Sequence, residues 1–524
     1  MAEGVKGGGR VAAMFIVAIF LASIIFIGLS ASDPQNDRKM FREGMADLMS
    51  KDRYRNSTWS ALVIDLSTGK VLYNLKSGTM MVPGSTTKLY SSTAVMQYLG
   101  TDFVTETPVY SVGVVENGHL NGTLVLKASW DLNMGGRGAL DGILNITDVD
   151  HGDANALGYC QLTGEDPLAG LDFLAQQVAS TGMTSADQVI IDMGAWGEQD
   201  IGKEHLVGPM AINDNLIDIV INATTVGQTA TCYFRPFTSA YSVACDVVTI
   251  DSGEDIIVVH QDSQGKLSVA GQIAAGHSTV RTFTVTDPAS FARTLFIEAL
   301  ERNGVSIGAD ETGANLQAEI PAGYGSSAAI ARMSSVPLRE DVKLTLKVSQ
   351  NFHADSYIAM LSYYTGSTDF TSGMVVMKSQ MDALGINTGQ VCLTDGEGGS
   401  AEDRFSAQAV CQLLRQAWSA QLNQSLLDAL PILGVDGSLA DSATNGSEAI
   451  GHVFAKTGTR AGSDHLNQRS LLFTKALAGY VHTSRGNWVA FALFVNDVPI
   501  GSIEQMMQVG SDLGYLSELI YHDY

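Results

Sequence analysis

The pattern of apolar and polar residues predicts two β-hairpins, one near each end of the chain. Alternation over residues 59–75 predicts two strands that flank a turn at 67–70. A second pair of apolar strands is predicted over 475–495, joined by a polar turn at 484–487.

Helices are predicted where apolar residues recur every three or four positions. These stretches cover residues 85–100, 291–304, 342–364 and 406–421. Residues 104–285 differ, because short strands alternate there with Gly-, Asp- and Asn-rich loops around one helix at 167–182. We therefore predict one domain built from residues 33–103 and 286–524, interrupted by mainly-β inserted domains at 104–285.

An uncharged apolar run occupies residues 11–29 near the N-terminus. As a helix it would be about 28 Å long, which is close to the thickness of a bilayer core. Lys6 and Arg10 precede the run, so residues 33–524 are expected on the outer side of the membrane. Residues 1–32 are either a signal peptide cleaved after small residues or an uncleaved membrane anchor. Both interpretations predict an extracytoplasmic protein of the cell envelope, either membrane-anchored or secreted.

Composition narrows the possible partners. The chain carries 31 Lys and Arg against 55 Asp and Glu, a formal net charge of −24. This charge argues against a nucleic-acid partner, because phosphate binding needs a basic surface. The five cysteines are an odd number and form no C-x-x-C, which argues against a zinc ribbon or a disulfide scaffold. A Cys232–Cys245 bridge is one interpretation, and five buried, reduced cysteines is the favoured one.

Three short motifs occur in a fixed order along the chain. Ser85 and Lys88 form an S-x-x-K at the start of a predicted helix, Ser349-Gln350-Asn351 an S-x-N inside a helical stretch, and Lys456-Thr457-Gly458 a K-T-G at the end of a strand. Each motif is common by chance when it stands alone. The ordered trio in these settings predicts a serine hydrolase that works through an acyl-enzyme.

The residue types fit that chemistry. On a helix, residues three apart share a face, so the Lys88 ammonium can reach the Ser85 hydroxyl. A serine becomes nucleophilic when a base takes its proton, and a lysine that is buried beside a second cation, here Lys456, can be that base. Ser349 can relay the proton to the leaving amine, and Asn351 can hold the scissile amide and orient Lys88.

The K-T-G strand is expected to bind the substrate. Lys456 and the Thr457 hydroxyl can bind a terminal carboxylate through charge-assisted hydrogen bonds. Gly458 and Thr459 continue this strand, and the Thr459 N–H together with the Ser85 N–H can stabilise an oxyanion. None of these roles needs a metal ion or a cofactor.

The chain resembles the class C, low-molecular-mass penicillin-binding proteins, which are serine-type D-Ala-D-Ala carboxypeptidases and endopeptidases. The similarity covers nearly all of residues 50–500 and includes the segments PGSTTKLYSSTAVMQYLG, PLREDVKLTLKVSQNFHADSY, DGEGGS (395–400), LPILGVDGSLA and AKTGT. The separation of Ser85 from Ser349 is also family-like, because these enzymes carry inserted domains there. A plain β-lactamase has no room for such an insertion.

The resemblance implies an α+β, β-lactamase/transpeptidase-like fold with an antiparallel sheet between helices. It implies that the substrates are peptidoglycan stem peptides and that β-lactams acylate Ser85. Two rivals stay open: a related D-aminopeptidase, esterase or β-lactamase, and a non-catalytic envelope-binding protein.

Three features depart from the family pattern. Gln350 stands where Asp is more usual, Glu397 adds a carboxylate to the D-G-x-G loop, and residues 460–481 after the K-T-G are longer than expected.

Two further groups have a structural interpretation at this stage. Asp148, Asp150, His151 and Asp153 form an acidic cluster that is interpreted as a solvated loop of the insertion, with a cation site as the alternative. His353 is two residues from Asn351, so on one helix it would face the other side and would not be a base.

Overall fold

The computed structural model describes residues 41–262, 265–420 and 422–524. The apolar run at 11–29, interpreted above as an anchor or a signal, lies outside the described residues. Among the described helices, none is long and apolar enough to cross a bilayer.

The sheet that supports the site is antiparallel throughout and has the order β19-β20-β21-β1-β2. Its strands are β1 (Thr58–Asp65), β2 (Val71–Leu75), β19 (Val453–Asp464), β20 (Arg469–His482) and β21 (Trp488–Ile500). The two predicted hairpins, β1–β2 and β20–β21, are therefore confirmed. They lie side by side because β1 pairs with β21 along its whole length.

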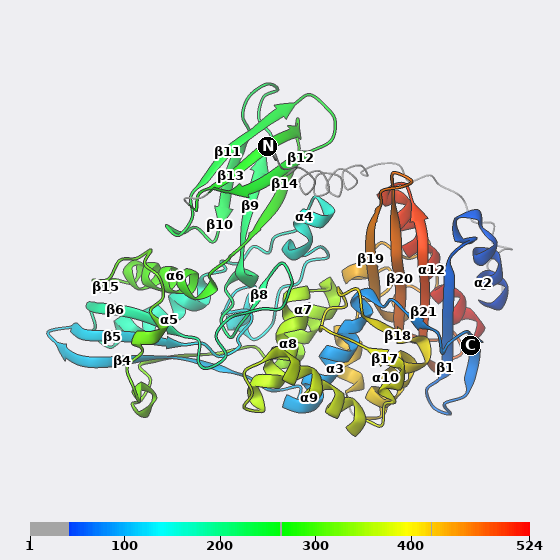
Figure 1. Ribbon diagram of the computed structural model, residues 1–524, viewed down its shortest axis with the longest axis horizontal. Coiled ribbons are helices and arrows are strands. Elements are labelled where there is room, and N and C mark those ends of the chain that lie inside the picture. The colour runs from blue at the N-terminus through cyan, green and yellow to red at the C-terminus, as the bar shows by residue number, and fades with distance from the viewer. Residues whose placement is uncertain (1–40, 263–264, 421) are drawn as a thin grey trace, which may run out of the picture.

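Helices cover both faces of this sheet (Figure 1). One face packs against α2 (Phe41–Ser50) and α12 (Ile503–Asp523). The other face packs against the helices that carry the motifs and their neighbours. These are α3 (Lys88–Leu99), α7 (Leu338–Val348), α8 (Asn351–Tyr364), α9 (Phe370–Ala383), α10 (Ala407–Ser419) and α11 (Asn423–Ala429).

A small sheet, β17-β18-β3, lies at the edge of these helices. Its strands are β3 (Met80–Met81), β17 (Val391–Cys392) and β18 (Arg404–Ser406). The result is a mixed α and β domain with its sheet between helices, as expected.

The inserted region has its own core and lies beside the first domain, on the left and at the top of Figure 1. A five-stranded mixed sheet, β15-β6-β5-β4-β16, packs against α5 (Ala169–Ser180) and α6 (Pro288–Arg302). Its strands are β4 (Glu106–Glu116), β5 (His119–Lys127), β6 (Ser185–Asp192), β15 (Ser306–Ile307) and β16 (Ala331–Ser334).

Two three-stranded sheets complete the inserted region, β10-β9-β14 and β11-β13-β12. Their strands are β9 (Leu216–Asn222), β10 (Thr231–Arg235), β11 (Val243–Ile250), β12 (Ile256–Gln261), β13 (Leu267–Ala274) and β14 (Ser278–Thr284). The short elements are α4 (Ala154–Leu157), β7 (Gln199–Asp200) and β8 (Leu206–Val207).

The C-terminal boundary of the insertion differs from the expected residue 285. The helix after that position, α6, packs on α5, and β15 and β16 join the sheet of β4 to β6. Helix α6 is amphipathic, but its apolar face is buried in the core of the insertion. We propose residues 104–335 as the insertion.

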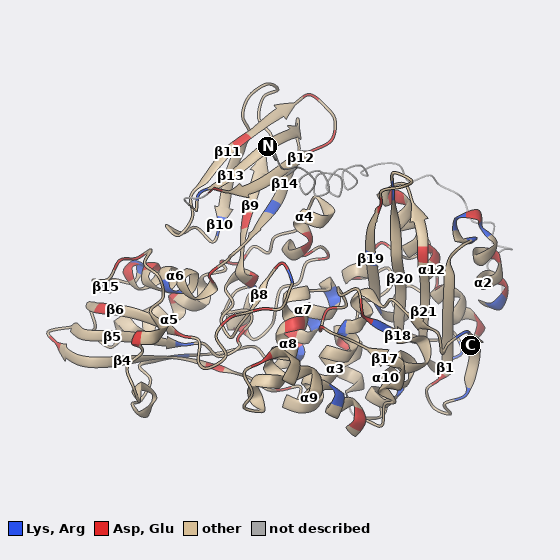
Figure 2. Ribbon diagram, in the orientation of Figure 1, with Lys and Arg blue, Asp and Glu red and all other residues tan. Residues whose placement is uncertain are grey.

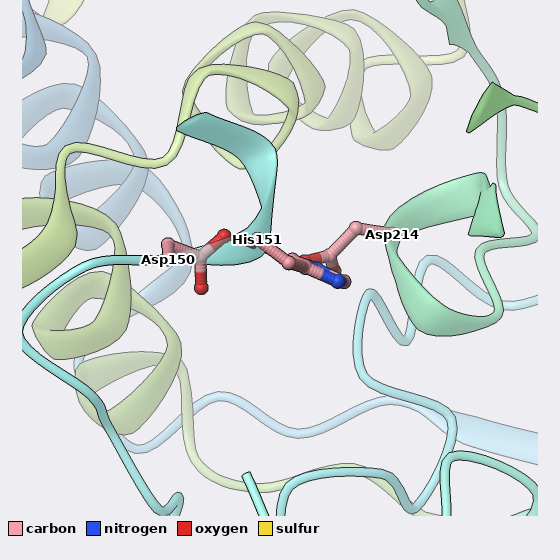
Figure 3. Close-up of side chains that lie close together, drawn as sticks. All are labelled: Asp150, His151 and Asp214. Atoms are coloured by element: carbon pink, nitrogen blue, oxygen red, sulfur yellow. Dashed lines mark hydrogen bonds and ion pairs between the residues drawn. The ribbon is translucent and has the colours of Figure 1, made fainter. Parts of the chain in front are cut away.

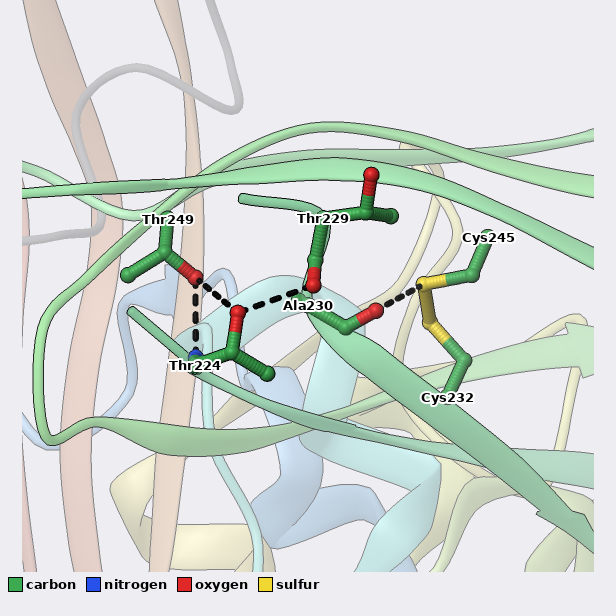
Figure 4. The surroundings of a disulfide bond; sticks show 6 residues. All are labelled: Thr224, Thr229, Ala230, Cys232, Cys245 and Thr249. Atoms are coloured by element: carbon green, nitrogen blue, oxygen red, sulfur yellow. Dashed lines mark hydrogen bonds between the residues drawn. A yellow bond between two sulfur atoms is a disulfide. The ribbon is translucent and has the colours of Figure 1, made fainter. Parts of the chain in front are cut away.

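The favoured interpretation of five reduced, buried cysteines is wrong. Cys232 on β10 and Cys245 on β11 form a disulfide, with their Cα atoms 5.8 Å apart (Figure 4). The two strands run side by side at that point, which brings the Cα atoms within the range a disulfide requires. Cys392 is exposed, Cys160 is half-buried and Cys411 is buried.

Charged residues of both signs are interspersed over the elements of both regions (Figure 2). Near the motif-bearing helices, several of these charges are buried and paired.

Candidate active site

Ser85 lies in a 3₁₀ turn, Gly84–Thr87, that runs directly into α3 at Lys88. The turn begins with Gly84 at φ +54°, a conformation that glycine adopts without strain. The Thr86 hydroxyl donates to the Pro83 carbonyl at 2.7 Å and ties the turn back on itself. Ser85 and Lys88 are thereby placed on one face, as the S-x-x-K spacing predicts.

Lys88 is fully buried and makes three hydrogen bonds through its ammonium group. Its Nζ lies 2.9 Å from Ser85 Oγ, 2.6 Å from Asn351 Oδ1 and 3.1 Å from the Glu397 carbonyl oxygen. These three acceptors match the three donors of an ammonium. Lys88 therefore joins the S-x-x-K, the S-x-N and the D-G-E-G loop.

The S-x-N does not lie inside one helix, contrary to the expectation for residues 342–364. Helix α7 ends at Val348, Ser349 adopts a left-handed conformation with φ +68°, and α8 begins at Asn351. The Gln350 side chain caps α8 by accepting from Phe352 N at 3.0 Å. The break turns Asn351 toward Lys88 and leaves the Ser349 side chain at the junction of the two helices.

The K-T-G lies on β19, which continues past it to Asp464 instead of ending there. Strand β19 pairs with β20 as far as Arg469, so the long segment after K-T-G forms an extended hairpin. A Cβ added to Gly458 would lie 2.3 Å from the Pro83 carbonyl oxygen, and one added to Gly84 would lie 2.8 Å from Thr459 N. The strand and the Ser85 turn therefore touch backbone to backbone.

Lys456 is also fully buried, and its Nζ donates to its neighbour's carbonyl, Thr457 O, at 3.1 Å. The Thr457 hydroxyl lies 2.9 Å from Ser438 Oγ. Thr457 of β19 therefore contacts the 3₁₀ turn Gly437–Leu439 through Ser438.

Burial lowers the pKa of both lysines. Burial lowers the pKa of Lys88, against the opposing charges of Glu397, Asp355 and Asp153. Burial, and then the charge of Lys88, hold the pKa of Lys456 well below its usual range. A neutral amine at Lys88 thereby becomes accessible nearer neutral pH.

The D-G-E-G loop packs against the Ser85 turn. A Cβ added to Gly398 would lie 2.0 Å from the Gly84 carbonyl oxygen. Asp395 holds the loop by accepting from Gly398 N at 2.6 Å and from Lys203 Nζ at 2.6 Å. Lys203 also pairs with Glu397 at 2.9 Å, so a lysine of the insertion accounts for the extra carboxylate of the loop.

Only part of the acidic cluster is solvated: Asp148 is exposed, but its neighbours are not. Asp150 and His151 are buried, and His151 points toward Asp214 of a neighbouring turn, with 2.7 Å between His151 Nε2 and Asp214 Oδ2 (Figure 3). Arg137 Nη2 bonds both Asp150 and Asp214, at 2.7 and 2.9 Å. Asp150, His151 and Asp214 are close enough together to bind a metal ion, but Arg137 already supplies the positive charge that they need.

Asp153 lies near the two lysines, although its sequence motif gave no reason to place it in the site. Burial raises the pKa of Asp153 to about 6, and the charges of Lys88 and Lys456 oppose that rise. Its neighbour Gly152 lies against Gln350, and Asp148 accepts from Gly437 N at 3.1 Å. The loop 148–153 of the insertion therefore lies against the domain that carries the three motifs, beside Lys88 and Lys456.

Comparison with known proteins finds a matching family and similar relatives that cover most of the chain. Residues 42–511 match the model of the D-Ala-D-Ala carboxypeptidase 3 (S13) family. The chain is 27% identical to the D-alanyl-D-alanine carboxypeptidase of an Actinomadura species, over 94% of this chain and 88% of that protein. It is 24% identical to the D-alanyl-D-alanine carboxypeptidase DacB of Haemophilus influenzae, over 84% of this chain and 85% of the relative.

A solved structure shares the fold. Penicillin binding protein 4 of Haemophilus influenzae, complexed with a β-lactam, superposes with a TM-score of 0.67 at 21% identity. The match covers 91% of this chain and 99% of the other.

Proposed function

Since the chain belongs to the D-Ala-D-Ala carboxypeptidase (S13) family, we propose that it is a serine-type D-Ala-D-Ala carboxypeptidase/endopeptidase that acts on peptidoglycan stem peptides. The observation that carries the proposal is the contact between Ser85 Oγ and the buried Lys88 Nζ at 2.9 Å. Ser85 is the nucleophile and Lys88 its general base.

The hydrogen bonds of Lys88 orient it for this role. A neutral amine has two N–H donors and one lone pair. Asn351 Oδ1 and the Glu397 carbonyl are acceptors only, so they take the two donors. The lone pair then faces Ser85, where it can accept the hydroxyl proton.

Acylation follows from this arrangement. Ser85 Oγ bonds to the carbonyl carbon of the penultimate D-Ala while its proton passes to Lys88. The N–H groups of Ser85 and Thr459 stabilise the oxyanion. The C–N bond then breaks, the proton reaches the leaving amine through Ser349, and D-alanine departs. Water afterwards attacks the ester, with Lys88 as base, and restores Ser85.

The K-T-G strand binds the terminal carboxylate of the substrate. The Lys456 amine supplies N–H donors, the Thr457 hydroxyl contacts Ser438 beside it, and Gly458 allows the strand to approach the Ser85 turn. β-Lactams carry the same carboxylate and a reactive amide, so they acylate Ser85 and remain as a ring-opened ester. The protein works outside the cytoplasm, and residues 1–32 either anchor it to the membrane or are removed on export.

Release of D-alanine tests this proposal. Purified protein is incubated with a stem pentapeptide that ends in D-Ala-D-Ala, and free D-alanine is measured. Wild type and Ser67→Ala, which changes an exposed serine in the β1–β2 turn, are expected to release it. Ser85→Ala is expected to release none. Folded wild-type protein that releases no D-alanine would contradict the proposal.

A further inference from the structure

Asp214 of the insertion is the centre of a buried network that reaches the S-x-N. Its Oδ2 accepts from His151 Nε2 at 2.7 Å, Arg137 Nη2 at 2.9 Å and Gln350 Nε2 at 3.1 Å. Its Oδ1 accepts from His353 Nε2 at 3.0 Å. His151, Gln350 and His353 are buried, the Arg137 side chain is 12% exposed, and Asp214 itself is only 4% exposed.

Gln350 and His353 stand on either side of Asn351 in the chain. Gln350 is the residue before it, and His353 lies in the first turn of α8 after it. Gln350 Nε2 also donates to Asp150 Oδ1 at 3.1 Å, and His353 Nδ1 pairs with Asp341 on α7 at 3.1 Å. The start of α8 is therefore held from two directions by carboxylates, with Asp214 common to both.

The backbone that presents Asp214 is strained. Asn213, Asp214 and Asn215 have φ values of +53°, +55° and +55°. A left-handed conformation costs an L-residue about 1–2 kcal/mol, and Asn and Asp tolerate it best. Three such residues in succession persist only when the surrounding contacts fix them. Asn215 makes one of these contacts, since Ile212 N donates to its Oδ1 at 3.2 Å.

The network also accounts for Gln350. Asp150 and Asp214 both present oxygen to this position, and both need a donor. An amide supplies it, whereas the Asp that is more usual in this place would set a third carboxylate against the other two. The departure from the family pattern therefore matches the charge of the loop 148–153 and of Asp214.

We propose that Asp214 is a positioning residue that holds Gln350 and His353, and through them keeps Asn351 Oδ1 on Lys88 Nζ. This inference rests on the proposed function of Ser85 and Lys88. Asp214 touches no reacting atom. Its loss should slow acylation because a displacement of about 1 Å at a reacting group can cost about 100-fold in rate.

The test is time-resolved labelling of the purified full-length protein with a fluorescent penicillin. Asp214→Asn is expected to label to the wild-type extent, with a first-order rate constant lower by about 10- to 100-fold. Gln350→Ala, which removes the amide from both carboxylates, is expected to slow labelling in the same way and decides the matter if Asp214→Asn does not fold. Asp192→Asn is the control, because Asp192 is also buried in the insertion but accepts from Gly194, Gln317 and Tyr324.

The labelling data distinguish a positioning role of Asp214 from a purely structural one. A purely structural role would lower the labelled fraction and leave the rate constant of the folded molecules unchanged, which would overturn the inference. A control that slows as much as Asp214→Asn would overturn it as well. Wild type that takes up no label would instead contradict the proposed function of Ser85.

Discussion

Lys88 Nζ donates to Asn351 Oδ1 at 2.6 Å, across a separation of 263 residues in the chain. The bond joins the first residue of α3 to the first residue of α8. It fixes the direction of the Lys88 amine, and so it links the folding of the insertion between these helices to the chemistry at Ser85.

Removal of the Lys88 amine should abolish most acylation. Lys88→Met keeps the length and apolar stem of the side chain but has no base, and general-base catalysis contributes about 100- to 10,000-fold. The rate constant of penicillin labelling is expected to fall by that factor. Lys378→Met, which changes an exposed lysine of α9, should label like wild type. Equal rates for the two variants would rule out Lys88 as the base.

The pH dependence of acylation should report a lysine with a lowered pKa. Burial lowers the pKa of Lys88 and favours its neutral form, so Lys88 can act as base below the ordinary lysine value of 10.5. Labelling rates measured from about pH 5 to about pH 11 should rise with pH and level off below 10.5. A rate that continues to climb in proportion to hydroxide through that value would contradict this assignment.

Gly458→Ala should separate the K-T-G strand from the nucleophile. The new methyl group would lie 2.3 Å from the Pro83 carbonyl oxygen, so β19 or the Ser85 turn must move. Overpacking of this kind costs about 1–3 kcal/mol of folding free energy. Thermal unfolding and labelling should both show the loss. Gly325→Ala, where a Cβ has open space around it, is the matched control and should change neither.

The buried imidazolium of His353 should make stability depend on pH. Burial alone would lower its pKa, but Asp341 and Asp214 outweigh burial and raise it from 6.5 to about 10. The folded state therefore binds this proton more tightly than the unfolded state, so the stabilisation is complete below pH 6.5 and is lost as pH rises to about 10.

His353→Gln is the variant that checks this. At pH 6 it should cost about 3–5 kcal/mol relative to wild type, because it leaves buried carboxylates without a charged partner. Denaturant unfolding at pH 6, 8 and 10 should show the difference shrinking as pH rises. A difference that grows with pH would contradict the sign of the shift.

Much of the site could be predicted from local sequence. The positions of Ser85 and Lys88 depend on one helical turn, and the two hairpins that build the sheet are apolar strands around short polar turns. The family follows from motifs that the chain retains in order. Such features are set by neighbours in the sequence, which is why pattern and spacing were enough.

Other features required tertiary structure. Residues 342–364 keep helical spacing on both sides of Ser349, but the carboxylates of the insertion and the cap from Gln350 break the helix there. The spacing in helix α6 cannot assign it to a domain, because amphipathic spacing shows that a face is buried and not what buries it.

The acidic cluster at 148–153 was interpreted as solvated for a related reason. Gln350, a partner of Asp150, and Asp214, a partner of His151, come from distant segments of the chain. The spacing of these residues in the sequence does not indicate that they contact one another.

Mass spectrometry of the penicillin adduct tests the central claim most directly. Wild-type protein is incubated with benzylpenicillin, digested, and searched for the ring-opened ester. The account predicts one adduct per chain on the peptide that contains Ser85, absent from Ser85→Ala and slow to form in Lys88→Met. An adduct on another residue, or folded wild-type protein without an adduct, would contradict it.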